Sequence, residues 1–154
     1  MGTSRGGEFI DASVEMLTVV AVLPVGQVVD GPFVTESDRS EWVFIGYDGN
    51  PEGDFEAVTI EQSWAGLGAK AKNEIDDITC AVVVAAGDHR DIKGARDRVY
   101  AIFADVEDAF RANPSLGFTS PTVAELSSGT LHQEQTDSGI QVRFVFNVSI
   151  MTRI

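Results

Sequence analysis

The stretch that decides the fold is Ile140-Gln141-Val142-Arg143-Phe144-Val145-Phe146-Asn147-Val148-Ser149-Ile150, close to the end of a chain of 154 residues. Large apolar side chains occupy every second position of this stretch, and most of the positions between them are polar. Successive side chains of a β-strand point to opposite faces of the sheet, so the alternation predicts a strand with one buried face. We assign residues 140–154 to this strand.

A partner strand is expected directly before it. Residues 122–135 read as a strand, and Thr136-Asp137-Ser138-Gly139 supplies the polar residues and the glycine of a turn. The two strands together predict a β-hairpin. Within the first of them, Ser127-Ser128-Gly129 is interpreted as an irregularity of the strand and not as a catalytic nucleophile, because no Gly-x-Ser-x-Gly elbow surrounds it.

An amphipathic helix is predicted upstream of the hairpin. Asp88 is the expected N-cap, with Asp91 three residues further on in a capping-box arrangement, and Asn113-Pro114 ends the helix. Its apolar residues recur three or four positions apart. They are Ile92, Ala95, Val99, Ile102, Phe103, Val106 and Phe110.

The first half of the chain predicts one helix and three strands, and a short strand can start before them. The helix covers residues 9–23 and stops at Pro24, with a β-branched run at 18–22 that shortens its last turn. A strand begins at 25–29, and residues 33–40 form a loop. Strands at 41–47 and 55–64 are expected to make a hairpin, and residues 78–86 a strand buried on both faces.

This order of elements predicts an α+β fold. We expect a single domain over residues 9–154 after a flexible segment at 1–8, with a mainly antiparallel or mixed sheet of four or five strands flanked by two main helices. A chain of this length buries roughly two-thirds of its unfolded surface, so it needs no disulfide or metal to fold. The single cysteine, Cys80, is expected to be a buried thiol within an apolar run.

The loop Asp48-Gly49-Asn50-Pro51-Glu52-Gly53-Asp54 imitates the start of an EF-hand calcium loop, because oxygen-bearing side chains recur at alternate positions. The twelfth position of such a loop requires a bidentate Glu. This chain has Thr59 there, and strands instead of helices flank the loop. The loop is therefore interpreted as a solvated turn or an assembly contact.

Charge narrows the possible partners. Lys and Arg number 11 against 24 Asp and Glu, which gives 11 − 24 = −13. Phosphate binding depends on clustered Lys and Arg, so this balance argues against a nucleic-acid binder and against attachment to an anionic membrane. No apolar run reaches the length of a membrane span.

Catalytic groups are not evident in the sequence. His89 and His132 have no Cys, His or carboxylate at metal-ligand spacing beside them. Adjacent positions on a helix or a strand do not face each other, so the neighbouring carboxylates Asp76 and Asp77 do not form an acid/base pair. We predict no catalytic, cofactor-binding or metal-binding residue, and a protein that is not an enzyme.

Three segments carry a family resemblance. Residues 44–55, Gln62-Ser63-Trp64-Ala65-Gly66-Leu67-Gly68-Ala69 and Ala124-Glu125-Leu126-Ser127-Ser128-Gly129 resemble tail terminator proteins of long-tailed bacteriophages of actinobacteria and of related prophage or phage-tail-like particles. The resemblance covers about residues 9–154. It transfers no catalytic residue.

The resemblance implies a structural role in the virion. Tail terminators are small α+β proteins that form a homohexameric ring on the tail tube, end its polymerisation and offer a surface to the head connector. For this chain it implies assembly in the host bacterial cytoplasm. It also implies DNA passing through the ring without specific binding, which an acidic channel would favour.

Six residues are predicted as interface positions facing the channel or the tube: Asp48, Asn50, Glu52, Asp54, Asp76 and Asp77. We also expect strand 140–154, as a sheet edge, or strand 41–47 to pair or pack between subunits. Two alternatives remain at this point: another neck or head–tail connector protein, and a small-molecule-binding α+β module.

Overall fold

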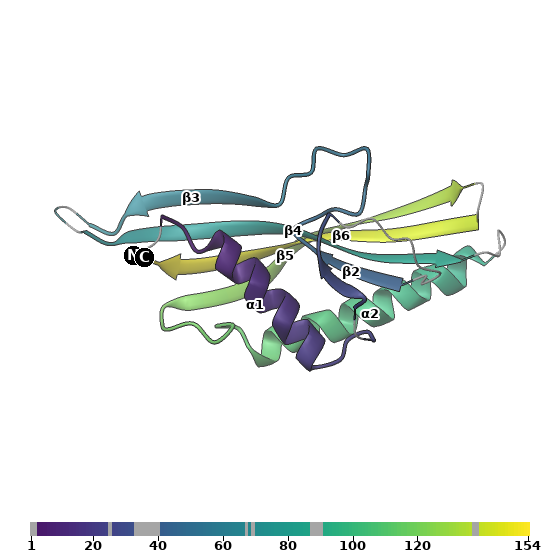
Figure 1. The fold of residues 1–154 in the computed structure, drawn as a ribbon, viewed down its shortest axis with the longest axis horizontal. Helices are drawn as coiled ribbons and strands as arrows, with labels where there is room; N and C mark the ends of the chain where they lie inside the picture. Colours follow the sequence, from purple (N-terminus) through teal and green to yellow (C-terminus); the bar gives the residue numbers. More distant parts are fainter. Residues whose placement is uncertain are drawn as a thin grey trace.

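The computed structural model describes residues 3–24, 26–32, 41–66, 68, 70–86, 91–136 and 139–154. These residues form two helices and six strands, in an open sheet with both helices packed on it (Figure 1). The α+β prediction is confirmed. In chain order the elements are α1 (Gly6–Val19), β1 (Val28–Asp30), β2 (Glu41–Ile45), β3 (Val58–Trp64), β4 (Lys72–Ala86), α2 (Ile92–Ala112), β5 (Thr122–Thr136) and β6 (Gly139–Arg153).

The predicted C-terminal hairpin is present as β5 and β6. The two strands pair along their whole length, from Thr122 opposite Thr152 to Thr136 opposite Gly139. The register shifts between Leu126 and Ser128, so the expected irregularity at residues 127–129 is a β-bulge. This hairpin supplies two of the longest strands in the sheet.

The position of β6 corrects one prediction. The sheet runs in the order β1-β2-β4-β6-β5, with β3 paired to β4 off this path. Strand β6 therefore lies between β4 and β5 and has no free edge, and β2 lies between β1 and β4. Neither strand can add to the sheet of a neighbouring subunit, because both edges already hold ladder hydrogen bonds. The edges belong to β1, β3 and β5.

Strands β2 and β3 do not form the hairpin that we predicted. Both pair antiparallel with β4, β2 along residues 80–84 and β3 along residues 72–78. Ile45 lies opposite Cys80 and Val58 opposite Ile78, so the two strands follow each other along one edge of β4. Residues 46–57 are therefore an excursion from an interrupted strand and not a hairpin tip. Strand β4 permits this arrangement because it is long enough to pair with both.

Helix α2 matches its predicted stripe. Most of the predicted apolar positions are buried, while Ile92 and Phe103 are half-buried, and Asn113 caps the end as expected. The N-cap is Asp91, whose Oδ1 accepts a hydrogen bond from the Gly94 amide at 3.0 Å. The predicted cap, Asp88, lies outside the described residues, as does His89. The capping group is therefore the second aspartate of the predicted pair.

Helix α1 begins and ends earlier than predicted, at Gly6 instead of residue 9 and at Val19 instead of residue 23. Ala21 has a φ of 56°, which ends the helical path before Pro24. The β-branched residues Val19 and Val20 lose side-chain freedom in a helix and favour this early end, as the sequence indicated.

None of the helices in the described part of the chain has the length and hydropathy that crossing a membrane requires.

The main core lies between the helices and one face of the sheet, which we call the helix face. Phe9 and Leu17 of α1 and Val99 and Phe110 of α2 join one cluster with alternate residues of β4 and β6. Residues 80–84 of β4 are buried on both faces, as predicted. Burial raises the pKa of the Cys80 thiol to about 12, consistent with a structural role.

Candidate interaction surface

The face of the sheet opposite the helices, the open face, is divided into two halves. Residues 46–57 fold over the half formed by β2 and the adjoining parts of β4 and β6. The other half is formed by β3, the first half of β4, the last half of β6 and the start of β5. We call these the covered half and the bare half.

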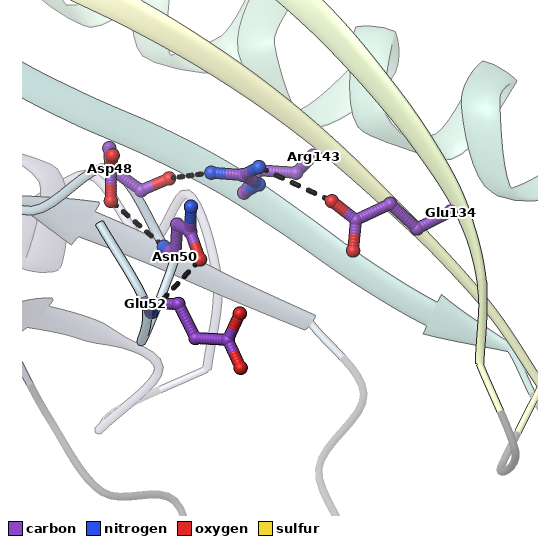
Figure 2. A network of polar contacts seen from close by, with 5 residues as sticks. All are labelled: Asp48, Asn50, Glu52, Glu134 and Arg143. Atoms are coloured by element: carbon purple, nitrogen blue, oxygen red, sulfur yellow. Dashed lines mark hydrogen bonds and ion pairs between the residues drawn. The ribbon is translucent and has the colours of Figure 1, made fainter.

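Side chains of the acidic loop organise its own backbone. The Oδ1 of Asp48 accepts from the Asn50 amide at 2.8 Å, and the Oδ1 of Asn50 accepts from the Glu52 amide at 3.0 Å (Figure 2). Asp54 does the same for Glu56 at 3.0 Å. Each of these contacts forms an Asx turn, in which an Asp or Asn side chain accepts from the backbone amide two residues further on. The described residues contain no group of three or more His, Cys, Asp or Glu arranged to hold a metal ion.

Arg143 fastens this loop to the sheet. Its guanidinium donates to the backbone oxygen of Asp48 at 2.8 Å and pairs with the Oε1 of Glu134 at 3.4 Å (Figure 2). Gly49 lies against the same side chain, with a φ of 77° and room for no Cβ, since that atom would be 2.9 Å from the Arg143 Cδ. The sequence placed Arg143 on the polar face of its strand and missed that it is buried.

An aromatic cluster fills the space beneath the loop. Trp42, Phe44 and Tyr47 are buried with Ala81 and Val83 in a second, smaller core. Phe44 and Tyr47 meet edge to face at 5.1 Å between ring centroids. Loop residue Phe55 stacks on Tyr47 at 5.9 Å, so the loop closes this core from outside.

The predicted residues Asp76 and Asp77 point to opposite faces of β4. Asp77 is half-buried on the open face, where its Oδ1 accepts a hydrogen bond from the Ser149 hydroxyl. Asp76 is 0% exposed on the helix face, beside Glu74 at 1%. The pair is therefore split. The carboxyl group of Asp76 has no exposed surface with which to face a channel.

Glu74 accepts hydrogen bonds from the segment that precedes α1. Its Oε1 accepts from the Ser4 hydroxyl and from the Arg5 amide, both at 2.9 Å, and its Oε2 accepts from the Gln62 side chain at 2.5 Å. Burial opposes ionisation, but these bonds and one from Asp76 outweigh it and lower the pKa of Glu74. Glu74 therefore stays ionised and joins β4 to the N-terminal segment and β3.

The pKa of Asp76 is shifted in the opposite direction to that of Glu74. Burial, the hydrogen bond with Glu74 and the charges of Glu74 and Asp77 raise its pKa to about 8. Within the described residues no donor reaches its carboxyl oxygens. A proton on Asp76 completes the pair by donating to Glu74. This pair was not evident from the sequence, because the strand was predicted to begin only at residue 78, whereas β4 begins at Lys72.

Four of the six predicted interface residues lie together in the acidic loop. Asp48, Asn50, Glu52 and Asp54 lie in the loop on the covered half, and Glu52 and Asp54 are exposed. Asp77 lies apart from them in the bare half. His132 is half-buried in β5 opposite Arg143. The structure thus offers an acidic loop and a separate bare surface.

Comparisons with known proteins add a likeness of fold. No family model matches this chain, and no curated protein matches it. A solved chain described as "Virion of native gene transfer agent (GTA) particle" is similar in fold, with a TM-score of 0.60 and 13% sequence identity. The alignment covers 98% of this chain and 100% of that one.

Proposed function

We propose that this chain is a structural protein of a phage-like virion, of the tail terminator type. The observation that carries the proposal is the similarity of fold to a chain of a gene transfer agent virion over nearly the whole of both chains. The three segments that resemble tail terminators support the more specific role. The proposal assigns no catalytic residue and no cofactor.

In this role the protein forms a homo-oligomeric ring, a hexamer, on the end of the tail tube. The ring ends tube polymerisation and offers its other side to the head connector. The parts assemble in the host bacterial cytoplasm and remain in the virion. The net charge of −13 suits a ring through which DNA passes, because it repels phosphate.

The acidic loop supplies the charge that the proposal places toward the channel or the tube. Glu52 and Asp54 are exposed, and the backbone bonds of Asp48 and Asn50 fix the loop that carries them. Asp77 lies apart from this loop in the bare half, half-buried and hydrogen-bonded to the Ser149 hydroxyl. Asp76 no longer belongs to this set, because it is buried.

Tail lengths test the function. Particles assembled without this protein should carry overlong tubes, and adding the purified protein should restore a uniform length. Tails of normal length that fail to join heads would contradict the terminator role and assign the chain to the head connector instead. Electron microscopy of negatively stained particles measures both outcomes.

A further inference from the structure

The bare half carries an apolar row that nothing in the described structure covers. Ile75 of β4, Met151 of β6 and Val123 of β5 lie directly opposite one another across the three strands. They are 37%, 54% and 49% exposed. Residues that face each other across neighbouring strands point to the same side of the sheet, so these three form one continuous surface, the open patch.

Acidic side chains border the open patch. Glu61 lies opposite Ile75, and Asp77 and Glu125 lie opposite Ser149 in the next row of the same face. Arg153 is the basic residue on the other side of Met151, and its Nε donates to the Asn73 side chain at 3.1 Å. Carboxylates therefore outnumber cations around this row.

A second exposed patch lies on the helix face at the same end of the sheet. Ile60 and Trp64 of β3 are 42% and 64% exposed, although they point to the helix side with Asp76 and Lys72 opposite them. The Lys72 ammonium lies 5.3 Å from the centroid of the Trp64 ring. We call Ile60, Trp64 and Lys72 the helix-side patch. Figure 1 shows β3 reaching the end of the molecule where the C-terminus lies.

The two patches differ in their side chains and in charge. The open patch is an apolar row with an acidic border, and the helix-side patch is an exposed aromatic with a lysine on its ring. They lie on opposite faces of the same sheet. A closed ring requires each subunit to present two different, complementary surfaces, one to each neighbour.

We propose that the open patch of one copy binds the helix-side patch of the next copy, and that this head-to-tail contact builds the ring. The inference rests on the proposed ring-forming function and names its two surfaces. Trp64 covers the row formed by Ile75, Met151 and Val123. Lys72 then meets the acidic border, which favours this orientation over contacts between like patches.

Two single variants test the contact. Trp64→Glu removes the helix-side patch and Met151→Glu removes the open patch, and each should abolish rings while leaving the subunit folded, because both residues are exposed. Tyr100→Glu is the matched control, since Tyr100 is an exposed aromatic on α2 outside both patches, at 47%. It should form rings like the unaltered protein. Native mass spectrometry gives the stoichiometry and circular dichroism the fold.

Mixing the two variants gives the sharpest result. Each keeps the surface that the other lacks, so an equimolar mixture should form a dimer with one copy of each variant and no larger species. A charge exchange serves as a second test that leaves Trp64 and Met151 in place. Lys72→Glu and Glu125→Lys should each weaken the ring, and both changes in one chain should restore it.

The outcomes separate this inference from the proposed function. If the unaltered protein is monomeric, the ring itself is wrong. If the unaltered protein forms rings and both single variants do so too, the ring stands and the two patches are the wrong surfaces. Folded variants that give no mixed dimer would also overturn the inference.

Discussion

Both halves of the open face carry apolar residues, which are buried in the covered half and exposed in the bare half. In the covered half, Trp42, Phe44 and Tyr47 lie beneath a loop that Arg143 fastens to the sheet. In the bare half an equally continuous apolar row is exposed. The same face of one sheet is thus partly an internal core and partly a surface that can bind another molecule.

This difference separates two kinds of contribution to the protein. Apolar residues in the covered half stabilise the subunit, because the chain itself removes them from water. The exposed area of those in the bare half can contribute only when a second molecule covers it. Substitutions in the first half should therefore change the free energy of unfolding, and those in the second half should change assembly.

The largest effect is expected for Phe44→Ala in the covered half. Phe44 is 5% exposed and contacts Tyr47 edge to face, so its loss leaves a cavity and should lower the free energy of unfolding by about 3–5 kcal/mol. Met151→Ala in the bare half should change it by no more than about 0.5 kcal/mol. Urea unfolding at a fixed concentration where the chain is monomeric measures both. Equal effects would contradict the division of the face.

Asp76→Asn should change how the free energy of unfolding depends on pH. Asp76 lies buried on the helix face of β4, behind the bare half. Asp76 has a pKa of about 8 in the folded chain against 3.8 for an ordinary Asp, so the folded state holds an extra proton between these values. Stability should therefore fall as pH rises from about 4 to about 8, by up to about 1.4 kcal/mol per unit, and then level off.

The asparagine variant cannot lose this proton, and its amide can still donate to Glu74. Its stability should fall less steeply, so that it exceeds the unaltered protein by about 3–4 kcal/mol at pH 8 when both are matched at pH 5. Asp108→Asn, on the exposed side of α2, is the control and should leave the slope unchanged. Thermal unfolding across this pH range provides the measurement. Parallel pH profiles for Asp76→Asn and the unaltered chain would refute the shared proton.

Arg143→Ala should loosen the loop over the covered half. The change removes a buried side chain, its bond to the Asp48 oxygen and its contact with Gly49, at a cost of about 2 kcal/mol. Arg153→Ala is a matched control, because Arg153 lies on the same face of β6 but is exposed. Hydrogen exchange should show faster opening of residues 46–57 in the first variant only.

Gly49→Ala should have the smallest of these effects, about 1 kcal/mol. Alanine is strained at a φ of 77°, and its Cβ would lie 2.9 Å from the Cδ of Arg143, so that this buried side chain would have to shift. Gly66→Ala adds a methyl group that meets no neighbouring atom within 4 Å. A drop in thermal stability for the first variant but not the second would confirm that the loop is held at Gly49.

The sequence predicts best those elements whose pattern repeats. The alternation in 140–150 and the helical stripe from Ile92 to Phe110 located β6 and α2, because burial of one face imposes a period that any stretch of the element shows. The β-bulge at 127–129 was also predictable, since serines and a glycine interrupt a strand.

Long-range pairing was not predictable in the same way. Two strands joined by a loop resemble a hairpin, and the sequence does not show that both pair with β4. Arg143 was missed because a charged residue at an alternate strand position usually points to water, and Glu74 was missed because its strand was predicted to begin only at residue 78. Their partners lie far away in the chain, at Asp48 for the arginine and at Ser4 and Arg5 for the glutamate.

Native mass spectrometry of the unaltered protein, alone and with its tube subunit, tests the central claim most directly. The claim is that this subunit assembles through the surface that its own chain leaves bare. We predict a closed ring with a single stoichiometry, six copies. A strictly monomeric mass at high protein concentration, even with the tube present, would contradict it.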